Sequence, residues 1–178
     1  MERVEATFTG CRRQDRRLAP VADTASAHII RPLKSGDQSQ LGDLYASTAG
    51  PSLDFLMTLG QQPTTCCWVL RGEASVIGAC WFACVQGEAE LIDFLISPKH
   101  RRRGFGALLL TGCLEQLTED AVFSCHLEVR RSNKAAIGLY HKAGFITVGE
   151  RPNYYHGNPE AEDAILMRWQ ADERPVHL

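Results

Sequence analysis

A basic segment with two glycines carries the clearest chemistry in the sequence. It reads Ser-Pro-Lys-His-Arg-Arg-Arg-Gly-Phe-Gly-Ala over residues 97–107 and opens directly into an apolar, helix-like run. Backbone amides at a helix N-terminus converge on an anion, glycine lets the backbone approach it closely, and the helix dipole favours negative charge. The same residues also suit a solvated turn, so the loop by itself leaves phosphate binding and a plain basic turn as equal alternatives.

The elements around this loop are predicted by hydrophobic patterning. Residues 89–96 are rich in Leu, Ile and Phe and end at Ser-Pro, which is typical of a strand, and residues 105–117 carry the apolar pattern of a helix. A second strand is expected at 123–129, followed by a helix that Ser132 or Asn133 caps. The basic loop therefore joins a strand to a helix, and a second strand-helix unit comes next.

The remaining segments predict a mixed α/β fold. Tyr154 and Tyr155 lie in a long polar connection between the last two expected strands. An antiparallel start, two strand-helix units and a closing hairpin together indicate the α/β class. The additional strands are expected at residues 28–32, 66–70, 76–85, 145–151 and 164–169, and the additional helices from about residue 35 and at 53–59.

Length and composition are those of one ordinary globular domain. The 178 residues are 44% hydrophobic, and 19 Lys and Arg against 21 Asp and Glu give a formal charge of -2. That balance provides no overall positive electrostatic potential for binding nucleic acid or an anionic membrane. No apolar run reaches the roughly 18 residues that a membrane-spanning helix needs. We expect a soluble protein with a single domain over residues 27–172, a mobile basic extension at 1–26 and a short tail at 173–178.

The seven cysteines favour a reducing compartment. They form no Cys-x-x-Cys pair and have no histidine spacing that suits zinc. Most fit small core positions, and Cys80 and Cys84 share one face of a predicted strand. We therefore expect a cytoplasmic protein with neither disulfides nor a metal site.

A second block, over residues 127–145, reads Leu-Glu-Val-Arg-Arg-Ser-Asn-Lys-Ala-Ala-Ile-Gly-Leu-Tyr-His-Lys-Ala-Gly-Phe. Together with the basic loop it resembles the GNAT superfamily of N-acetyltransferases, whose acyl-CoA pyrophosphate loop has Gln or Arg, two residues, Gly, one residue, and Gly or Ala. With Arg-Pro-Asn-Tyr-Tyr at 151–155 and Glu-Asp-Ala-Ile-Leu-Met at 162–167, the likeness narrows to the RimI-like ribosomal-protein-alanine acetyltransferases. The resemblance implies the GNAT fold: a central mixed, mostly antiparallel sheet, splayed between its two middle strands and flanked by helices.

The resemblance also implies a binding site for the co-substrate acetyl-CoA. The end of one strand presents its backbone to the amide groups of pantetheine, the basic loop cradles the pyrophosphate, and a helix cap touches the pantetheine arm. An apolar strand end is otherwise plain core, and Asn133 is otherwise a cap alone. The residues concerned are Phe94, Leu95 and Ile96 for the strand, Arg102, Arg103, Gly104, Phe105, Gly106 and Ala107 for the loop, and Asn133 for the cap.

Catalysis is assigned by the same resemblance to Glu128 and Tyr140. The matching glutamate accepts the proton of the amine, directly or through water, and the matching tyrosine protonates the departing thiolate. Alternation along a strand turns Glu128 away from the apolar residues on either side of it. The alternatives are structural: Glu128 as an edge residue paired with Arg130 or Arg131, and Tyr140 as a core aromatic.

The predicted acceptor is a protein N-terminus, the alanine end of a small-subunit ribosomal protein. Tyr154 and Tyr155 would either border the peptide entrance or only stabilise the hairpin by packing against it. An α-amine, with a pKa near 7.7 to 8.0, demands less of a glutamate base than a lysine amine near 10.4. The alternatives are acetylation of a polyamine or aminoglycoside, and a non-catalytic acyl-CoA-binding module. We expect a monomer or weak dimer that contacts neither membrane nor nucleic acid.

Overall fold

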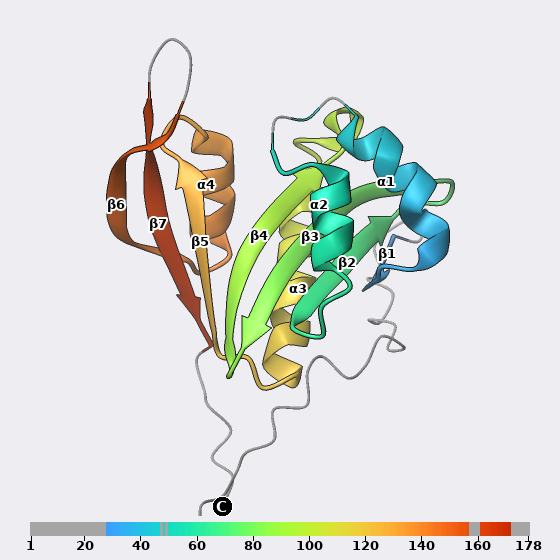
Figure 1. Cartoon of the computed structure of the whole chain (residues 1–178), viewed down its shortest axis with the longest axis horizontal. Helices are drawn as coiled ribbons and strands as arrows, with labels where there is room; N and C mark the ends of the chain where they lie inside the picture. The colour runs from blue at the N-terminus through green and yellow to red at the C-terminus, as the bar shows by residue number, and fades with distance from the viewer. Residues whose placement is uncertain (1–27, 47, 49, 157–160, 172–178) are drawn as a thin grey trace, which may run out of the picture.

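The computed structural model describes residues 28–46, 48, 50–156 and 161–171, and Figure 1 shows their arrangement. The predicted extension at 1–26 and tail at 173–178 lie outside the described residues. Every helix and strand predicted from the sequence is present. The strands are β1 (Ile29–Pro32), β2 (Thr65–Arg71), β3 (Val76–Val85), β4 (Glu88–Ile96), β5 (Ser124–Arg130), β6 (Ile146–Tyr155) and β7 (Glu162–Gln170), and the helices are α1 (Gln38–Tyr45), α2 (Leu53–Leu59), α3 (Phe105–Glu119) and α4 (Lys134–Lys142), with short 3₁₀ turns at Ser35–Asp37 and Pro98–His100.

The sheet divides into two halves that meet at one short parallel contact. Its strand order is β1-β2-β3-β4-β5-β7-β6, and every neighbouring pair is antiparallel except β4 and β5. That pair is in register only from Glu88 to Glu90 on β4 and from Ser124 to His126 on β5. Beyond these residues the two strands diverge, as Figure 1 shows. The mixed, mostly antiparallel sheet, splayed between its middle strands, confirms the predicted fold class.

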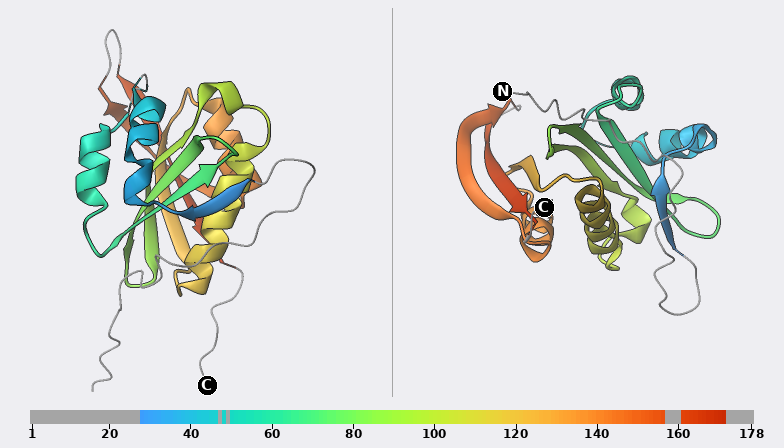
Figure 2. Two further views of the ribbon diagram at one scale, coloured as in Figure 1. Left: turned by 90° about the vertical axis from the view of Figure 1, so that its right-hand side faces the viewer. Right: turned by 90° about the horizontal axis from the view of Figure 1, so that it is seen from below.

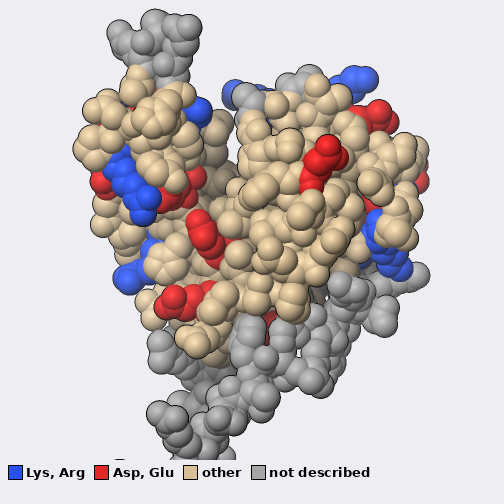
Figure 3. Space-filling view, viewed as in Figure 1, with Lys and Arg blue, Asp and Glu red and all other residues tan. Residues whose placement is uncertain are grey.

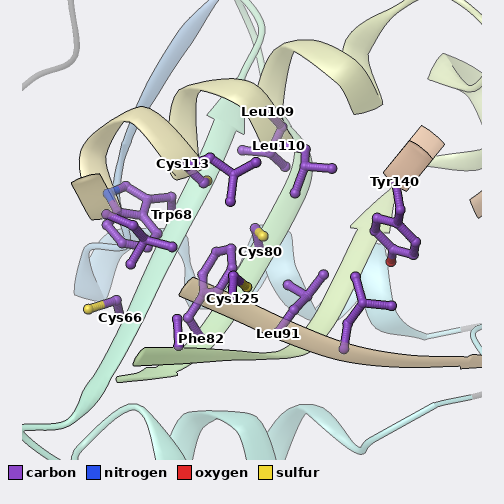
Figure 4. Close-up of a cluster of buried hydrophobic side chains, with 14 of the residues drawn as sticks. Cys66, Trp68, Cys80, Phe82, Leu91, Leu109, Leu110, Cys113, Cys125 and Tyr140 are labelled. Carbon is purple, nitrogen blue, oxygen red and sulfur yellow. The ribbon is translucent and has the colours of Figure 1, made fainter. Parts of the chain in front are cut away.

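The two faces of the sheet bury separate apolar clusters. Helices α3 and α4 cover one face and α1 and α2 the other (Figure 2). The larger cluster, on the α3/α4 face, includes Trp68, Phe82 and Leu110, and Tyr140 lies at one side of it in Figure 4. The smaller cluster, on the α1/α2 face, is built around Trp81. Alternating side chains of the central strands feed both clusters, which fixes the direction in which each strand residue points.

The predicted environment of the cysteines is confirmed for the core strands. Cys80 and Cys84 are both buried in the larger cluster, on one face of β3, and Cys113 and Cys125 join them there. Burial raises the pKa of the Cys80 and Cys125 thiols. These sulfurs therefore act as small apolar groups rather than as nucleophiles.

The first helices are tied to the edge of the sheet by a buried carboxylate. Asp37 is only 2% exposed, and it accepts two hydrogen bonds of 2.7 Å from Arg31 and one of 3.0 Å from Arg71. The Lys34 amide donates a further bond of 2.9 Å to the same carboxylate. These bonds join β1, β2 and the start of the α1 region, and they lower the pKa of Asp37 to about 2.

The position predicted for the two adjacent tyrosines is wrong. Tyr154 and Tyr155 belong to β6, which continues to Tyr155, rather than to a polar connection. Pro152 and Asn153 occupy an irregularity in the ladder, after which Tyr155 pairs again with Glu162. A proline is tolerated at such a bulge because no ladder hydrogen bond is required there.

Within the part of the chain that the structure describes, no helix is both long enough and apolar enough to cross a membrane.

Candidate active site

The basic loop forms a left-handed turn that leads into α3. Arg102 and Gly104 both have positive φ, at 58° and 84°, and Gly104 is the residue before the first turn of the helix. The Leu108 amide donates to the Gly104 carbonyl at 3.0 Å, so the helix begins here. The amides of the first helical turn have no carbonyl one turn earlier to bind, and they are left to point out of the helix end. This backbone is suited to an anion.

The arginines of the loop have different contacts. Arg101 donates from Nε to the Ile96 carbonyl at 3.0 Å, which holds the loop to the end of β4. Arg103 lies over the ring of Phe105, at 5.4 Å from its centroid, and is exposed. Arg102 is also exposed. Two cationic side chains therefore remain at the surface beside the helix start.

Phe105 faces away from the sheet gap and helps to hold the loop in place. The centroid of its ring lies 4.6 Å from the ring centroid of His28 and 6.1 Å from that of His100. Gly106 lies on the other side of the turn, where an added Cβ would meet Leu139 of α4 at 3.3 Å. The residues from Arg102 to Ala107 therefore form the turn after β4 and the first residues of α3, which lie against α4.

The end of β4 borders the opening between the two halves of the sheet. Phe94, Leu95 and Ile96 pair with β3 on one side, and the ladder to β5 has already ended at Glu90. One extra β4 residue, Ile92, lies between the pairs Phe82–Leu91 and Trp81–Asp93 and bends the strand. The outer edge of β4 beyond Glu90 is thus available to an extended ligand, although the Ile96 carbonyl already accepts a bond from Arg101.

Asn133 acts as the cap of α4. Its Oδ1 accepts a hydrogen bond of 3.1 Å from the Ala136 amide, and the side chain is exposed. Of the two predicted caps, Asn133 rather than Ser132 performs this role. The Ser132 amide instead donates to Glu162 at 2.5 Å, which anchors the turn before α4 to β7.

Glu128 points to the α1/α2 face, as alternation along β5 predicts, and its side chain is 22% exposed. Its ion-pair partner is Arg151 of β6, with 3.1 Å between Arg151 Nη1 and Glu128 Oε1. The predicted alternative of a pair with Arg130 or Arg131 is wrong, because those arginines bind the acidic residues of β6 and β7. Those acidic partners lie on neighbouring strands, which the spacing along one strand does not reveal.

Tyr140 approaches the opening from the opposite face. It is 7% exposed and packs against Phe94 of β4 and Phe145, with ring centroids 6.4 Å and 5.7 Å away. Burial raises the pKa of its phenol, so the hydroxyl keeps its proton at neutral pH. Tyr140 and Glu128 therefore lie on opposite faces of β5, beside the gap where β4 and β5 separate.

The tyrosine pair of β6 lies next to Glu128. Tyr154 is 43% exposed, and hydrogen bonding to the Glu128 carboxylate raises the pKa of its phenol. Tyr155 is half-buried, with Arg130 over its ring at 4.1 Å, and the two tyrosine rings meet edge to face. Figure 3 shows this face of the molecule hollowed between its two halves.

A buried polar network near the gap was not predicted. Asp93, on the α1/α2 face of β4, accepts a hydrogen bond of 2.5 Å from the Tyr45 hydroxyl, which in turn accepts one of 3.1 Å from Trp81 Nε1. Burial raises the pKa of Asp93. No local spacing could have identified this network, because Tyr45 and Trp81 each fit an apolar pattern and meet Asp93 only through the fold.

Comparison with known proteins identifies the family. The model of the Acetyltransferase (GNAT) family matches residues 36–145, which is more than half of the chain. The chain belongs to the GNAT acetyltransferase family. The reaction of this family is acetyl transfer, and its acetyl donor is acetyl-CoA.

Individual relatives place this GNAT chain more narrowly. It is 41% identical over 83 residues to the [ribosomal protein bS18]-alanine N-acetyltransferase of Escherichia coli (strain K12), a match that covers 47% of this chain and 56% of the relative. The chain thus spans little more than half the length of that relative. The crystal structure of the ribosomal-protein-S18-alanine N-acetyltransferase from Escherichia coli superposes with a TM-score of 0.77 at 28% identity, over 85% of this chain and 98% of the other. The predicted resemblance is therefore confirmed.

A more distant solved structure has the same fold. It is a spermidine N-acetyltransferase from Vibrio cholerae in complex with CoA and spermine, with a TM-score of 0.69 at 21% identity, over 80% of this chain and 95% of the other. At this identity the likeness concerns the fold alone.

Proposed function

We propose that this chain transfers the acetyl group of acetyl-CoA to the N-terminal α-amino group of a protein, with the alanine end of a small-subunit ribosomal protein as acceptor. The observation that carries the proposal is the gap between β4 and β5, with a phenol on one side of the sheet and a carboxylate on the other. The similarity to bS18-alanine acetyltransferases supports the choice of acceptor. A ribosomal acceptor implies that the reaction takes place in the cytoplasm. The catalytic unit in this proposal is a single domain over residues 27–172.

In this proposal acetyl-CoA enters from the α3/α4 side. The pyrophosphate lies against the turn from Arg102 to Ala107, with Asn133 beside the pantetheine arm. The pantetheine chain runs along the open edge of β4 at Phe94, Leu95 and Ile96, where main-chain groups face no neighbouring strand. The thioester then reaches the gap beside Tyr140.

The peptide N-terminus enters from the α1/α2 face, past Tyr154 and Tyr155. The neutral amine attacks the thioester carbon, a C–N bond forms, and the amine proton passes to Glu128, directly or through water. The C–S bond then breaks, and the leaving thiolate takes the phenolic proton of Tyr140. Glu128 releases its proton to water and Tyr140 recovers one, so both groups return to their starting states.

Mass spectrometry of the full chain with acetyl-CoA and a panel of acceptors tests this proposal. The panel holds an alanine-started ribosomal peptide, the same peptide with a blocked N-terminus and a lysine left unmodified, spermidine and an aminoglycoside. Acetylation confined to the unblocked N-terminus is expected. Transfer to the small amines alone would overturn the acceptor, and binding of CoA with no transfer to any acceptor would make the chain a binding module.

A further inference from the structure

The strand β6 carries an irregularity next to the carboxylate of Glu128. Arg151 pairs with Ala164 and Tyr155 with Glu162, so three β6 residues span the distance that Asp163 covers alone on β7. Asn153, within this bulge, has a φ of 55°, a conformation that asparagine tolerates better than most residues. A bulge beside an active site commonly redirects side chains, and this one directly follows Arg151, whose ladder partner Ala164 pairs on its other side with Arg130, two residues after Glu128.

The bulge is held in place by a carboxylate. The Asn153 amide donates to Asp163 Oδ1 at 2.9 Å, and the other oxygen of Asp163 accepts a bond of 3.2 Å from Arg131 Nε. Arg131 also pairs with Glu150 on β6. Contacts from Asp163 of β7, Glu150 of β6 and Arg131, just after β5, therefore hold the irregular backbone in place. The bulge is an ordered part of the fold rather than a frayed strand end.

The side chains of Arg151, just before the bulge, and Tyr154, at its end, are both associated with Glu128. Arg151 forms the 3.1 Å ion pair, and its guanidinium lies over the Tyr154 ring at 5.3 Å from the centroid. The Glu128 carboxylate also raises the pKa of the Tyr154 phenol. Arg151 keeps 54% of its side chain exposed while Glu128 keeps 22%, so the guanidinium stands on the solvent side of the carboxylate.

Other charged groups of both signs lie on this face. Glu90 of β4 is exposed, Asp93 lies farther along the same strand, partly buried against Tyr45, and Arg168 of β7 is exposed. Arg130 of β5 is directed to Tyr155 and Glu162 rather than to Glu128. Arg151 is in direct ion-pair contact with Glu128 and therefore offsets its charge where an amine would approach.

We propose that Arg151 is a specificity-determining residue, which disfavours permanently protonated amines at Glu128 and so selects N-terminal α-amines. This inference rests on the proposed function. A lone carboxylate attracts any ammonium ion, whereas a carboxylate paired with a guanidinium has little net charge to offer. An arginine stays charged at every physiological pH, so it repels a protonated acceptor at close range but not a neutral one.

The selection follows from the protonation of the competing amines. An α-amine, with a pKa of about 7.7 to 8.0, is partly neutral near pH 7.5, whereas a lysine or polyamine amine near 10.4 is almost wholly charged. The repulsion therefore falls chiefly on side-chain amines and polyamines. Removal of the guanidinium leaves Glu128 without its ion-pair partner, which should admit those cations.

The test compares Arg151→Gln with two control variants of the full chain. Arg151→Lys keeps the charge, and Arg168→Gln removes an exposed arginine of β7 that pairs across the ladder with His126, two residues before Glu128. For each variant, kcat/KM is measured with the alanine-started peptide, with its N-terminally blocked lysine form and with spermidine. Ratios between acceptors are compared, because a partly unfolded variant loses activity toward all acceptors equally.

We expect Arg151→Gln to raise the ratio of lysine-peptide or spermidine activity to α-amine activity at least tenfold, through a lower KM for the charged amines. Arg151→Lys should keep the wild-type ratio within threefold, and Arg168→Gln within twofold. An unchanged ratio in Arg151→Gln, or the same rise in Arg151→Lys, would overturn the inference. A wild-type preference for spermidine or the blocked peptide would instead overturn the proposed function, so the two failures are distinguishable.

Discussion

Tyr140, the proposed proton donor, and Glu128, the proposed proton acceptor, flank the gap in the sheet. The surroundings of each side chain match its proposed role. Tyr140 is buried among aromatic rings, and the raised pKa of its phenol keeps the proton that a leaving thiolate needs. Glu128 is partly exposed and forms an ion pair with Arg151. The proposed general acid, Tyr140, is therefore buried, whereas the proposed general base, Glu128, is partly exposed to solvent.

At the residue scale, Tyr140→Phe should lower kcat about 100-fold and leave the acetyl-CoA affinity within twofold of wild type. The ring contacts to Phe94 and Phe145 survive in this variant, while the proton donor to the thiolate is lost. Steady-state kinetics and calorimetric titration with acetyl-CoA provide the two readouts. A parallel loss of affinity would instead identify Tyr140 as a packing residue.

At the scale of an element, the turn before α3 depends on one glycine with positive φ. Gly104 has a φ of 84°, which costs a residue with a Cβ roughly 1–2 kcal/mol, and an added Cβ would meet no protein atom within 4 Å. The space beside the Gly104 Cα, which no protein atom fills, is therefore the space that the pyrophosphate would occupy. Backbone strain and crowding of the ligand act in the same direction here.

Gly104→Ala should weaken acetyl-CoA binding about tenfold or more, as measured by calorimetric titration. The matched control is Gly42→Ala in the interior of α1, where an added Cβ also meets nothing within 4 Å and φ is not positive. That control should leave the affinity unchanged and stabilise the fold by roughly 0.5–1 kcal/mol. Equal affinities in the two variants would argue against a pyrophosphate site at this turn.

At the scale of the whole molecule, the edge of the sheet depends on the buried carboxylate of Asp37. Because folding lowers the pKa of this group from 3.8 to about 2, the carboxylate contributes stability above pH 4. That contribution, about 2 kcal/mol, disappears as the pH falls through the folded-state pKa. Replacement by a neutral group also leaves Arg31 and Arg71 without their shared partner.

Asp37→Asn should lower the free energy of unfolding by at least about 2 kcal/mol at pH 7, measured by urea denaturation. The difference from wild type should shrink between pH 4 and pH 2, as the wild-type carboxylate becomes protonated. Asp43→Asn, at an exposed position of α1, is the control and should change the stability by less than about 0.5 kcal/mol. A constant difference across the pH range would contradict the linkage.

The sequence by itself determined the order and type of the elements, the glycine-bearing turn and the residues proposed for the site. Apolar periodicity, the Asn133 cap and the basic run before α3 are local features, because each depends on residues within a few positions of one another. The family motifs added the roles of Glu128 and Tyr140.

The tertiary structure alone decided which groups meet. The separation of β4 from β5, the approach of Tyr140 and Glu128 from opposite faces, and the Asp93–Tyr45 bond all join residues distant in the chain. The pairing of Glu128 with Arg151 requires the register of β5, β7 and β6, whereas the sequence pattern placed the residues after Arg151 in a polar connection. Register and bulges are set by packing across strands, which a local pattern does not record.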